Sequence, residues 1–133
     1  MNKKTVLIAE KDNATRLLFE VYLRRNGYGV VKAMDGGDAL NIVKNNKIDI
    51  VICNLYMLGI DGISITEIIR NKLGLDKIVL IIVDDEDDCE KMEHAIASGA
   101  NEYIIKPVLE SMLIEKIKEH TNGRSNRDTV VVS

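Results

Sequence analysis

Hydrophobic residues in this chain gather in five short runs, separated by longer stretches in which apolar positions recur at helical spacing. The most apolar run, Ile48 to Cys53, is rich in β-branched side chains and predicts a strand buried on both faces. The other four runs are similarly short, so we expect five strands: Thr5–Ala9, Gly29–Ala33, Asp49–Cys53, Ile78–Val83 and Glu102–Ile105.

The stretches between and after these runs predict five helices: Asn13–Asn26, Gly37–Asn45, Ile63–Lys72, Glu86–Ser98 and Leu109–His120. Strands that alternate with helices of this length form a parallel sheet through right-handed crossovers, with helices on both faces. The pattern therefore predicts a flavodoxin-like, doubly wound α/β fold with a five-stranded parallel sheet and five helices in (βα)5 order. The polar composition after His120 predicts one domain over residues 1–120 and a flexible tail over residues 121–133.

Composition argues against several classes of function. The chain has 18 Lys and Arg against 21 Asp and Glu, a net charge of −3, and no basic block, so nucleic acid is not an expected partner. No apolar run approaches the roughly 18 residues that cross a membrane, and the first run is too short for a signal peptide. We expect a cytoplasmic protein with no membrane contact. No glycine-rich nucleotide loop and no paired-aspartate phosphatase motif follows a strand, so we do not expect an enzyme.

The cysteines and histidines do not indicate a metal centre. Two cysteines form neither a disulfide framework nor a zinc site, and Cys53, in a buried strand, is expected to be a packed thiol. His94 and His120 fall on predicted helices without a convergent partner. Both histidines are therefore expected on the solvated surface.

Polar residues stand where the predicted strands end. Glu10 and Lys11 follow the first strand, Asn54 follows the third, Asp84 the fourth and Lys106 the fifth. In open parallel α/β sheets, binding and chemistry are found just past the carboxyl ends of the strands. We expect these five residues to meet in one pocket.

The loop after Asn54 adds a family resemblance. Met57 to Gly62 reads Met-Leu-Gly-Ile-Asp-Gly, and Lys106-Pro107 follows the last strand. In this order, these features resemble the receiver domains of response regulators, of the chemotaxis-type single-domain kind, which take phosphoryl groups from histidine kinases. The resemblance runs from Lys4 to about His120 and implies the flavodoxin-like fold as well.

The resemblance also implies roles for single positions. Asn54 takes the place of the family's phosphorylated aspartate, and Lys11 takes the place of the carboxylate that usually binds magnesium. Asp84 stands where the family has a threonine or serine that bonds the phosphoryl group. Glu10 and Lys106 keep the family's residue types.

Two further positions carry the family's switch and partner face. Tyr103 takes the place of the switching aromatic residue, and Pro107 follows the lysine after the last strand. By resemblance, the Lys106–Pro107 peptide bond is expected to be cis. Tyr103 also has the simpler interpretation of a half-buried tyrosine on an edge strand.

The changed positions bear on the reaction. An amide cannot form the acyl phosphate of a carboxylate, and an ammonium group repels a metal dication. The chain is thus identified as a degenerate receiver, a pseudo-receiver, that has lost the family's magnesium site and needs no cofactor. We expect a stand-alone, phosphorylation-independent interaction module of two-component (phosphorelay) signalling. Its partner is expected to be a histidine kinase or a downstream effector, and its state a monomer or weak homodimer.

Two alternatives stay open at this level. The chain could be a phosphorylatable receiver that uses another carboxylate, such as Asp84 or Asp49. Asn54 could also be an engineered replacement of aspartate, although this would not account for Lys11 or Asp84.

The charges predict how the pocket is closed. We expect ion pairs of Lys11 with Glu10 or Asp84, and of Lys106 with Asp84, with Asn54 hydrogen-bonded among them, since buried charges persist mainly when they are paired. In the alternative arrangement, Lys11 and Asp84 point into solvent, where an exposed pair contributes about 0–1 kcal/mol.

Overall fold

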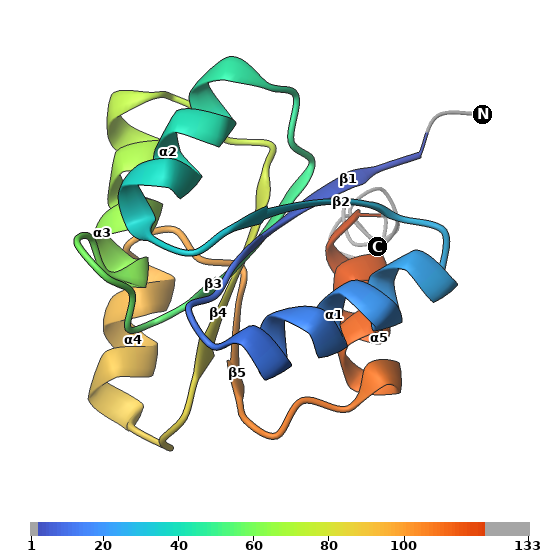
Figure 1. The fold of residues 1–133 in the computed structure, drawn as a ribbon. Helices are drawn as coiled ribbons and strands as arrows, with labels where there is room; N and C mark the ends of the chain where they lie inside the picture. The colour runs from blue at the N-terminus through green and yellow to red at the C-terminus, as the bar shows by residue number, and fades with distance from the viewer. Residues whose placement is uncertain (1–2, 122–133) are drawn as a thin grey trace, which may run out of the picture.

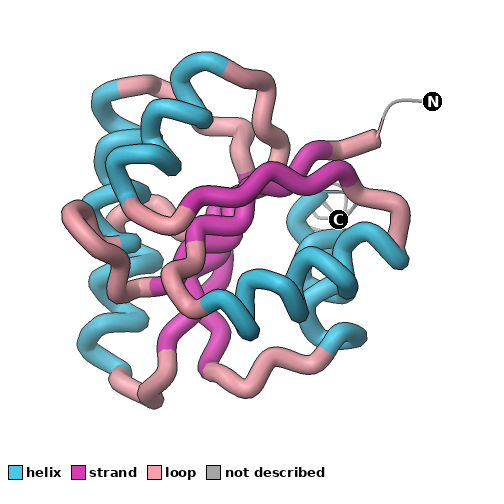
Figure 2. The backbone as a smooth tube through the Cα atoms, in the orientation of Figure 1, coloured by secondary structure: helices cyan, strands magenta, loops and turns pink. Residues whose placement is uncertain are grey.

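The structure is a computed structural model, of which residues 3–121 are described. Five parallel strands form one sheet in the order β2-β1-β3-β4-β5 (Figures 1 and 2). The strands are β1 Thr5–Ala9, β2 Gly29–Ala33, β3 Ile50–Asn54, β4 Val79–Asp84 and β5 Glu102–Ile105. This topology confirms the predicted flavodoxin-like α/β fold.

Helices cover both faces of the sheet, as Figure 1 shows. On one face lie α1 and α5, and on the other lie α2, α3 and α4. Their bounds are α1 Asn13–Arg25, α2 Gly36–Asn45, α3 Gly62–Glu67, α4 Cys89–Ala97 and α5 Glu110–Thr121. The two layers bury separate apolar clusters, one built on Phe19, Leu113 and Ile117 and the other on Ala39, Val43 and Ile65.

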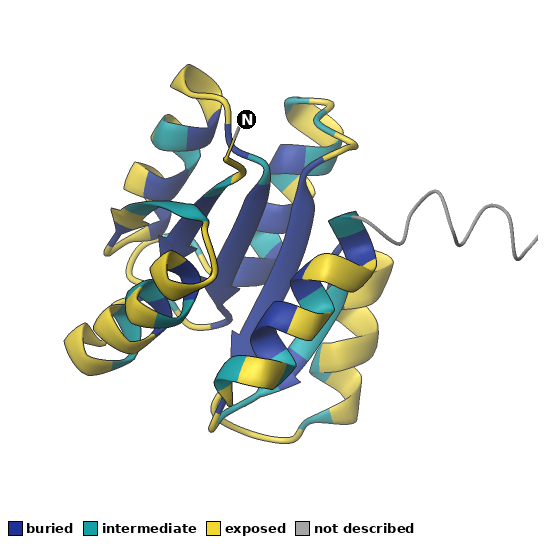
Figure 3. Ribbon diagram, turned by 90° about the vertical axis from the view of Figure 1, so that its right-hand side faces the viewer, coloured by how far each residue is buried: buried dark blue, intermediate teal, exposed yellow. Residues whose placement is uncertain are grey.

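The central strands form the most buried part of the molecule, as Figure 3 shows. Every residue of β3 and β4 is buried, because helices pack on both faces of these strands. This explains why their sequences are nearly continuous apolar runs rather than alternating ones. Cys53 packs within β3 as a free thiol, and burial raises its pKa to about 12. Cys53 is thus the packed thiol predicted from the sequence.

Aspartates begin four of the helices. The side chains of Asp12, Asp35, Asp61 and Asp88 accept hydrogen bonds from backbone N–H groups in the first turns of α1, α2, α3 and α4. Such caps satisfy N–H groups that have no partner within the helix. Hydrogen bonds from Thr15 hold the pKa of the Asp12 carboxyl below its ordinary value.

Several predicted boundaries need correction. The stretch Ile63–Lys72 is not one α-helix, because α3 ends at Glu67 and a π-helical segment, Ile68–Lys72, follows. The helix predicted from Glu86 begins only at Cys89, since the Asp84 side chain accepts from the Glu86 N–H and Asp88 is the cap. Strands β3 and β4 each lie one residue further along than predicted.

The end of the domain differs slightly from its predicted position. Thr121, assigned to the flexible tail from the sequence, is the last residue of α5. The rest of that predicted tail, residues 122–133, lies outside the described part of the chain. Within the described residues, no helix has both the length and the apolar character needed to cross a membrane.

Candidate functional site

The carboxyl ends of β1, β3 and β5 bring three polar side chains together. Glu10 directly follows β1, Asn54 ends β3 and Lys106 directly follows β5. Glu10 and Asn54 are 1% and 3% exposed, so both are removed from solvent although they are polar. The structure therefore brings together three of the five predicted pocket residues, at the predicted edge of the sheet.

Glu10 is the centre of the hydrogen bonding in this pocket. Its Oε2 accepts from the Asn54 side-chain Nδ2 and from the Asp12 backbone N–H, each at 3.0 Å. The predicted hydrogen bonding of Asn54 is thus present, with Glu10 as acceptor. The Asn54 Oδ1 is buried and has no hydrogen-bond partner among the described residues.

Lys106 supplies the positive charge of the pocket. Its Nζ lies 3.1 Å from the Glu10 Oε1 and 3.1 Å from the Asp85 Oδ1, and the side chain is 19% exposed. Burial lowers the pKa of Lys106, but the hydrogen bonds and charges of Asp85 and Glu10 outweigh burial, and the net pKa lies above its ordinary value. Lys106 therefore stays protonated and offsets the buried charge of Glu10.

Asp84 belongs to a separate contact. It is fully buried at the end of β4, its Oδ2 accepts from the Tyr103 hydroxyl, and its Oδ1 accepts from the Glu86 N–H at 3.3 Å. Burial, and then the hydrogen bond and charge of Asp84, raise the pKa of Tyr103 well above 10.0. The Tyr103 hydroxyl thus remains a donor and is held toward the sheet.

Two predicted ion pairs are wrong. Lys106 pairs with Glu10 and Asp85 rather than with Asp84. Lys11 is exposed and has no ion pair among the described residues, because it lies in the bend between β1 and α1. The alternative arrangement, with both side chains in solvent, fits Lys11 but not Asp84, which is fully buried.

Sequence reasoning missed Asp85 as a member of this pocket. Its side chain is 60% exposed and reaches Lys106 from the rim. Asp85 is the second residue of the acidic run Asp84–Asp88, and acidic residues at the start of a predicted helix are typical of a solvated cap. Asp49, the other carboxylate considered, lies at the opposite end of β3, where its Oδ2 accepts from the Thr5 N–H at 2.8 Å.

The loop after β3 packs tightly against the pocket. The Gly62 N–H donates to the Leu55 carbonyl at 2.8 Å, and a Cβ on Gly62 would lie 2.8 Å from the Asn54 carbonyl oxygen. Only glycine permits this close approach of backbone to backbone. On the other side of the pocket, the Lys106–Pro107 peptide bond is cis, as predicted.

The residues at this edge do not fit a magnesium ion. Magnesium in proteins is bound through one or two carboxylates in octahedral geometry. The two oxygens of Glu10 face Lys106, Asn54 and the Asp12 N–H. Lys11, where the family resemblance implies a second carboxylate, is exposed and carries a positive charge. Two buried side-chain oxygens accept no hydrogen bond within the described residues: Asn54 Oδ1, which is neutral, and Glu10 Oε1, whose charge is matched by the ion pair with Lys106.

The fold and the pocket define a doubly wound signalling domain with a polar site at the carboxyl edge of its sheet. Residues 6–118 match the model of the response regulator receiver domain, and the chain belongs to this family. It is therefore a receiver domain of two-component signalling, a system in which receivers act with histidine kinases and phosphotransfer proteins.

Relatives and solved structures agree with this assignment. The receiver domain protein (CheY-like) from Methanospirillum hungatei is 26% identical, with a TM-score of 0.86 over 95% of this chain and 99% of that chain. The transcriptional regulatory protein AfsQ1 of Streptomyces coelicolor is 29% identical over 86% of this chain and 49% of its own length. A cyclic di-GMP phosphodiesterase of Thermotoga maritima is 31% identical over 90% of this chain and 32% of its own length. The chain thus spans half or less of these two curated relatives.

Proposed function

We propose that this receiver domain is a protein-interaction module that works without phosphorylation, in other words a pseudo-receiver. The observation that carries the proposal is the state of Asn54. Its side chain ends β3 at the phospho-acceptor position and donates to Glu10 at 3.0 Å, and Glu10 in turn pairs with Lys106. The pocket is thus closed by its own side chains.

The chemistry of the pocket supports the loss of phosphoryl transfer. A carboxylate oxygen can attack phosphorus and form an acyl phosphate as the bond to the donor's leaving group breaks, whereas an amide oxygen is a poor nucleophile and its nitrogen is not basic. Phosphoryl transfer also depends on a cation that neutralises developing charge. With Lys11 turned outward and Glu10 occupied, we expect magnesium not to bind beside Asn54.

The Tyr103 contact supports a fixed signalling state. Asp84 is a permanent acceptor for the Tyr103 hydroxyl, whereas the threonine or serine of the family resemblance can turn toward a phosphoryl group. A buried carboxylate that loses its donor costs about 1–3 kcal/mol or more. We therefore propose that Tyr103 stays in the inward position whatever the state of the pocket.

The partner is proposed to be a protein of the same two-component pathway, a histidine kinase or a downstream effector. Beside the pocket, Leu18, Tyr22, Pro107 and Leu109 line a groove of about 430 Å³ between α1 and the loop before α5. Leu109 is 64% exposed. Exposed apolar side chains next to a groove are typical of a protein-binding surface. We propose no catalytic activity for this domain.

Intact-mass measurement after incubation with acetyl phosphate and magnesium tests the proposal. The natural sequence is expected to show no added phosphoryl group. The triple variant Asn54→Asp, Lys11→Asp, Asp84→Thr restores the family's residue types and is the matched positive control, expected to gain one group. A gain on the natural sequence would contradict the proposal.

Asp85 gives the second candidate, a receiver that uses another carboxylate. It is exposed at the pocket rim and contacts the lysine that would steady a phosphoryl group. Peptide mapping of any phosphorylated product separates the two functions, because a group on Asp85 would support the second. The variant Asp85→Asn should then abolish the gain in mass.

A further inference from the structure

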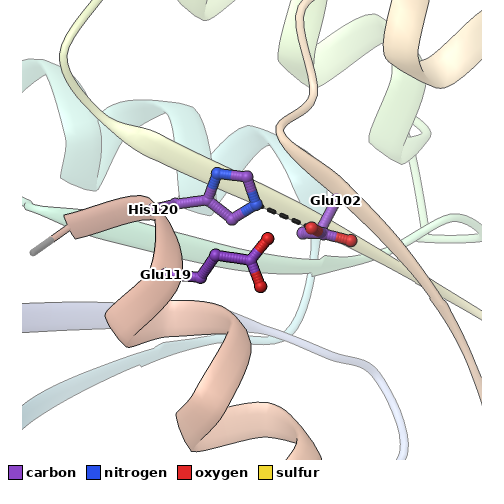
Figure 4. Close-up of side chains that lie close together, drawn as sticks. All are labelled: Glu102, Glu119 and His120. Carbon is purple, nitrogen blue, oxygen red and sulfur yellow. Dashed lines mark hydrogen bonds and ion pairs between the residues drawn. The ribbon is translucent and has the colours of Figure 1, made fainter. Parts of the chain in front are cut away.

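A cluster of three metal-ligand side chains lies at the edge of the sheet opposite the pocket. Glu102 is the first residue of β5, and Glu119 and His120 lie in the last turn of α5. One ligand atom from each of these side chains lies within 4.8 Å of those from the other two. Figure 4 shows the three side chains converging from the strand and the helix.

The sequence predicts His120 on the solvated surface, and this prediction is wrong because His120 is buried. Its side chain is only 8% exposed, and its Nε2 lies 2.7 Å from the Glu102 Oε2. The Glu119 side chain is 52% exposed, so the cluster has one buried nitrogen ligand and one side open to solvent. Sequence spacing could not reveal this convergence, because Glu102 and His120 come from different elements.

We propose that Glu102, Glu119 and His120 form a site for a zinc-class divalent cation, with water as a further ligand. One imidazole nitrogen with two carboxylate oxygens is a ligand set that suits zinc, whereas magnesium and calcium prefer oxygen alone. In tetrahedral zinc sites, neighbouring ligand atoms lie about 3.3 Å apart. When the ion binds, the distance between His120 Nε2 and Glu102 Oε2 would increase slightly, and the Glu119 carboxylate would move toward the ion. The ion would take the place of the proton that His120 and Glu102 share.

Positively charged lysine side chains lie near the cluster and disfavour the binding of a cation. The Lys116 Nζ lies 3.6 Å from the Glu102 Oε2 and 3.8 Å from the Glu119 Oε2, with a side chain 33% exposed. This ammonium is a cation already placed between the two carboxylates, and an arriving ion displaces it into solvent. Lys4 and Lys77 line a hollow beside His120, together with Asp49.

The site would join two segments that meet only in the folded chain. A cation that binds the folded state alone raises the melting temperature as its concentration exceeds the dissociation constant. Because Glu102 directly precedes Tyr103 in β5, the ion would strengthen the strand that carries the proposed switch residue. The site is independent of the pocket around Asn54.

Zinc titration of the full chain by calorimetry, with thermal unfolding at each ratio, tests this site. One zinc ion is expected to bind saturably and to raise the melting temperature, while magnesium produces neither effect. His120→Gln and Glu102→Gln should weaken zinc binding at least tenfold. Glu119→Gln, at a half-exposed position that folding tolerates, should weaken it too, and Lys116→Met should strengthen it.

The matched control is Cys89→Ser with His94→Gln, which removes the exposed cysteine and the other histidine. This double variant should bind zinc as the natural chain does. Absence of saturable binding to the natural chain would overturn the proposal. Binding that survives Glu119→Gln and His120→Gln but disappears in the double variant would place the ion on α4 and overturn it equally.

Discussion

Lys106 supplies the positive charge that balances the pocket, whereas the sequence predicted that Lys11 and Lys106 would share this role. Both Lys11 and Lys106 follow strand ends, and both were expected to pair with buried carboxylates. Only Lys106 does so, because Lys11 lies in the bend before α1 and is exposed. The direction in which a side chain leaves a short bend depends on backbone angles, which a pattern of residue types does not contain.

The two lysines therefore predict a contrast in stability. Lys106→Met leaves the 1%-exposed carboxylate of Glu10 without its cation, and the free energy of unfolding is expected to fall by about 1–3 kcal/mol. Lys11→Met is the matched control and should change it by less than about 0.5 kcal/mol. Urea unfolding of both variants checks this contrast; equal effects would contradict the pairing.

The Tyr103 hydroxyl is predicted to stabilise the folded chain through Asp84. Tyr103→Phe removes the hydroxyl and leaves a fully buried acceptor with one of its two hydrogen bonds, so a loss of about 1–3 kcal/mol is expected at pH 7. Urea unfolding measures it. Tyr28→Phe, at another partly buried tyrosine whose hydroxyl makes no hydrogen bond within the described residues, serves as the control for removing a hydroxyl and should cost less.

The stabilisation by the Tyr103 hydroxyl is also predicted to depend on pH. The pKa of Tyr103 is raised in the folded chain, so its stabilisation is complete below the unfolded pKa of about 10 and declines as pH rises beyond it. The difference in unfolding free energy between the natural chain and Tyr103→Phe should therefore be constant below about pH 10 and narrow as the pH rises above it. A difference that widens with pH would show that Tyr103 ionises more readily when folded.

At the scale of elements, the alternation of apolar runs and helical stretches was sufficient to predict the architecture. Strands β1, β2 and β5 have the predicted bounds, and the other two differ by one residue. The interruption in Ile63–Lys72 was not predictable from apolar spacing, since residues of the α-helical and π-helical parts bury the same face. Ile65 and Ile69, on either side of the change, are both fully or almost fully buried.

Arg70 is the contact that holds this π-helical segment to the rest of the domain. Its guanidinium donates to the carbonyls of Gly99 and Leu75 at 3.0 and 2.7 Å and to the Asn101 Oδ1 at 2.9 Å. The Asn101 Oδ1 also accepts from the Leu80 N–H at 2.8 Å, at the start of β4. One side chain thus connects the segment to the corner before β5.

Replacement of this guanidinium is predicted to destabilise the domain. Arg70→Lys keeps the charge but cannot reach three acceptors in the planar geometry of arginine, and a loss of about 1–3 kcal/mol is expected. Arg24→Lys, at an exposed pair with Glu20, is the matched control and should cost less than about 0.5 kcal/mol. Thermal or urea unfolding compares them; a neutral Arg70→Lys would show that the network contributes little.

At the scale of the whole molecule, we propose that Asn54 lies where a signal would enter this receiver and Tyr103 where it would be read. In this chain the first position is an amide bonded to Glu10, and the second is a tyrosine bonded to Asp84. The identities of these residues were evident from the sequence. The partners of these residues were not evident from the sequence. Lys106 pairs with Asp85 rather than with Asp84, and this depends on how the chain turns after β4.

The central claim is that the pocket and Tyr103 do not respond to phosphorylating conditions. Amide spectra of the natural chain, recorded with and without acetyl phosphate and magnesium, test it most directly. No change is predicted at Glu10, Asn54 or Tyr103, whereas the triple variant Asn54→Asp, Lys11→Asp, Asp84→Thr should show shifts at the pocket and along β5. Saturable shifts of Asn54 and Tyr103 in the natural chain would contradict the account.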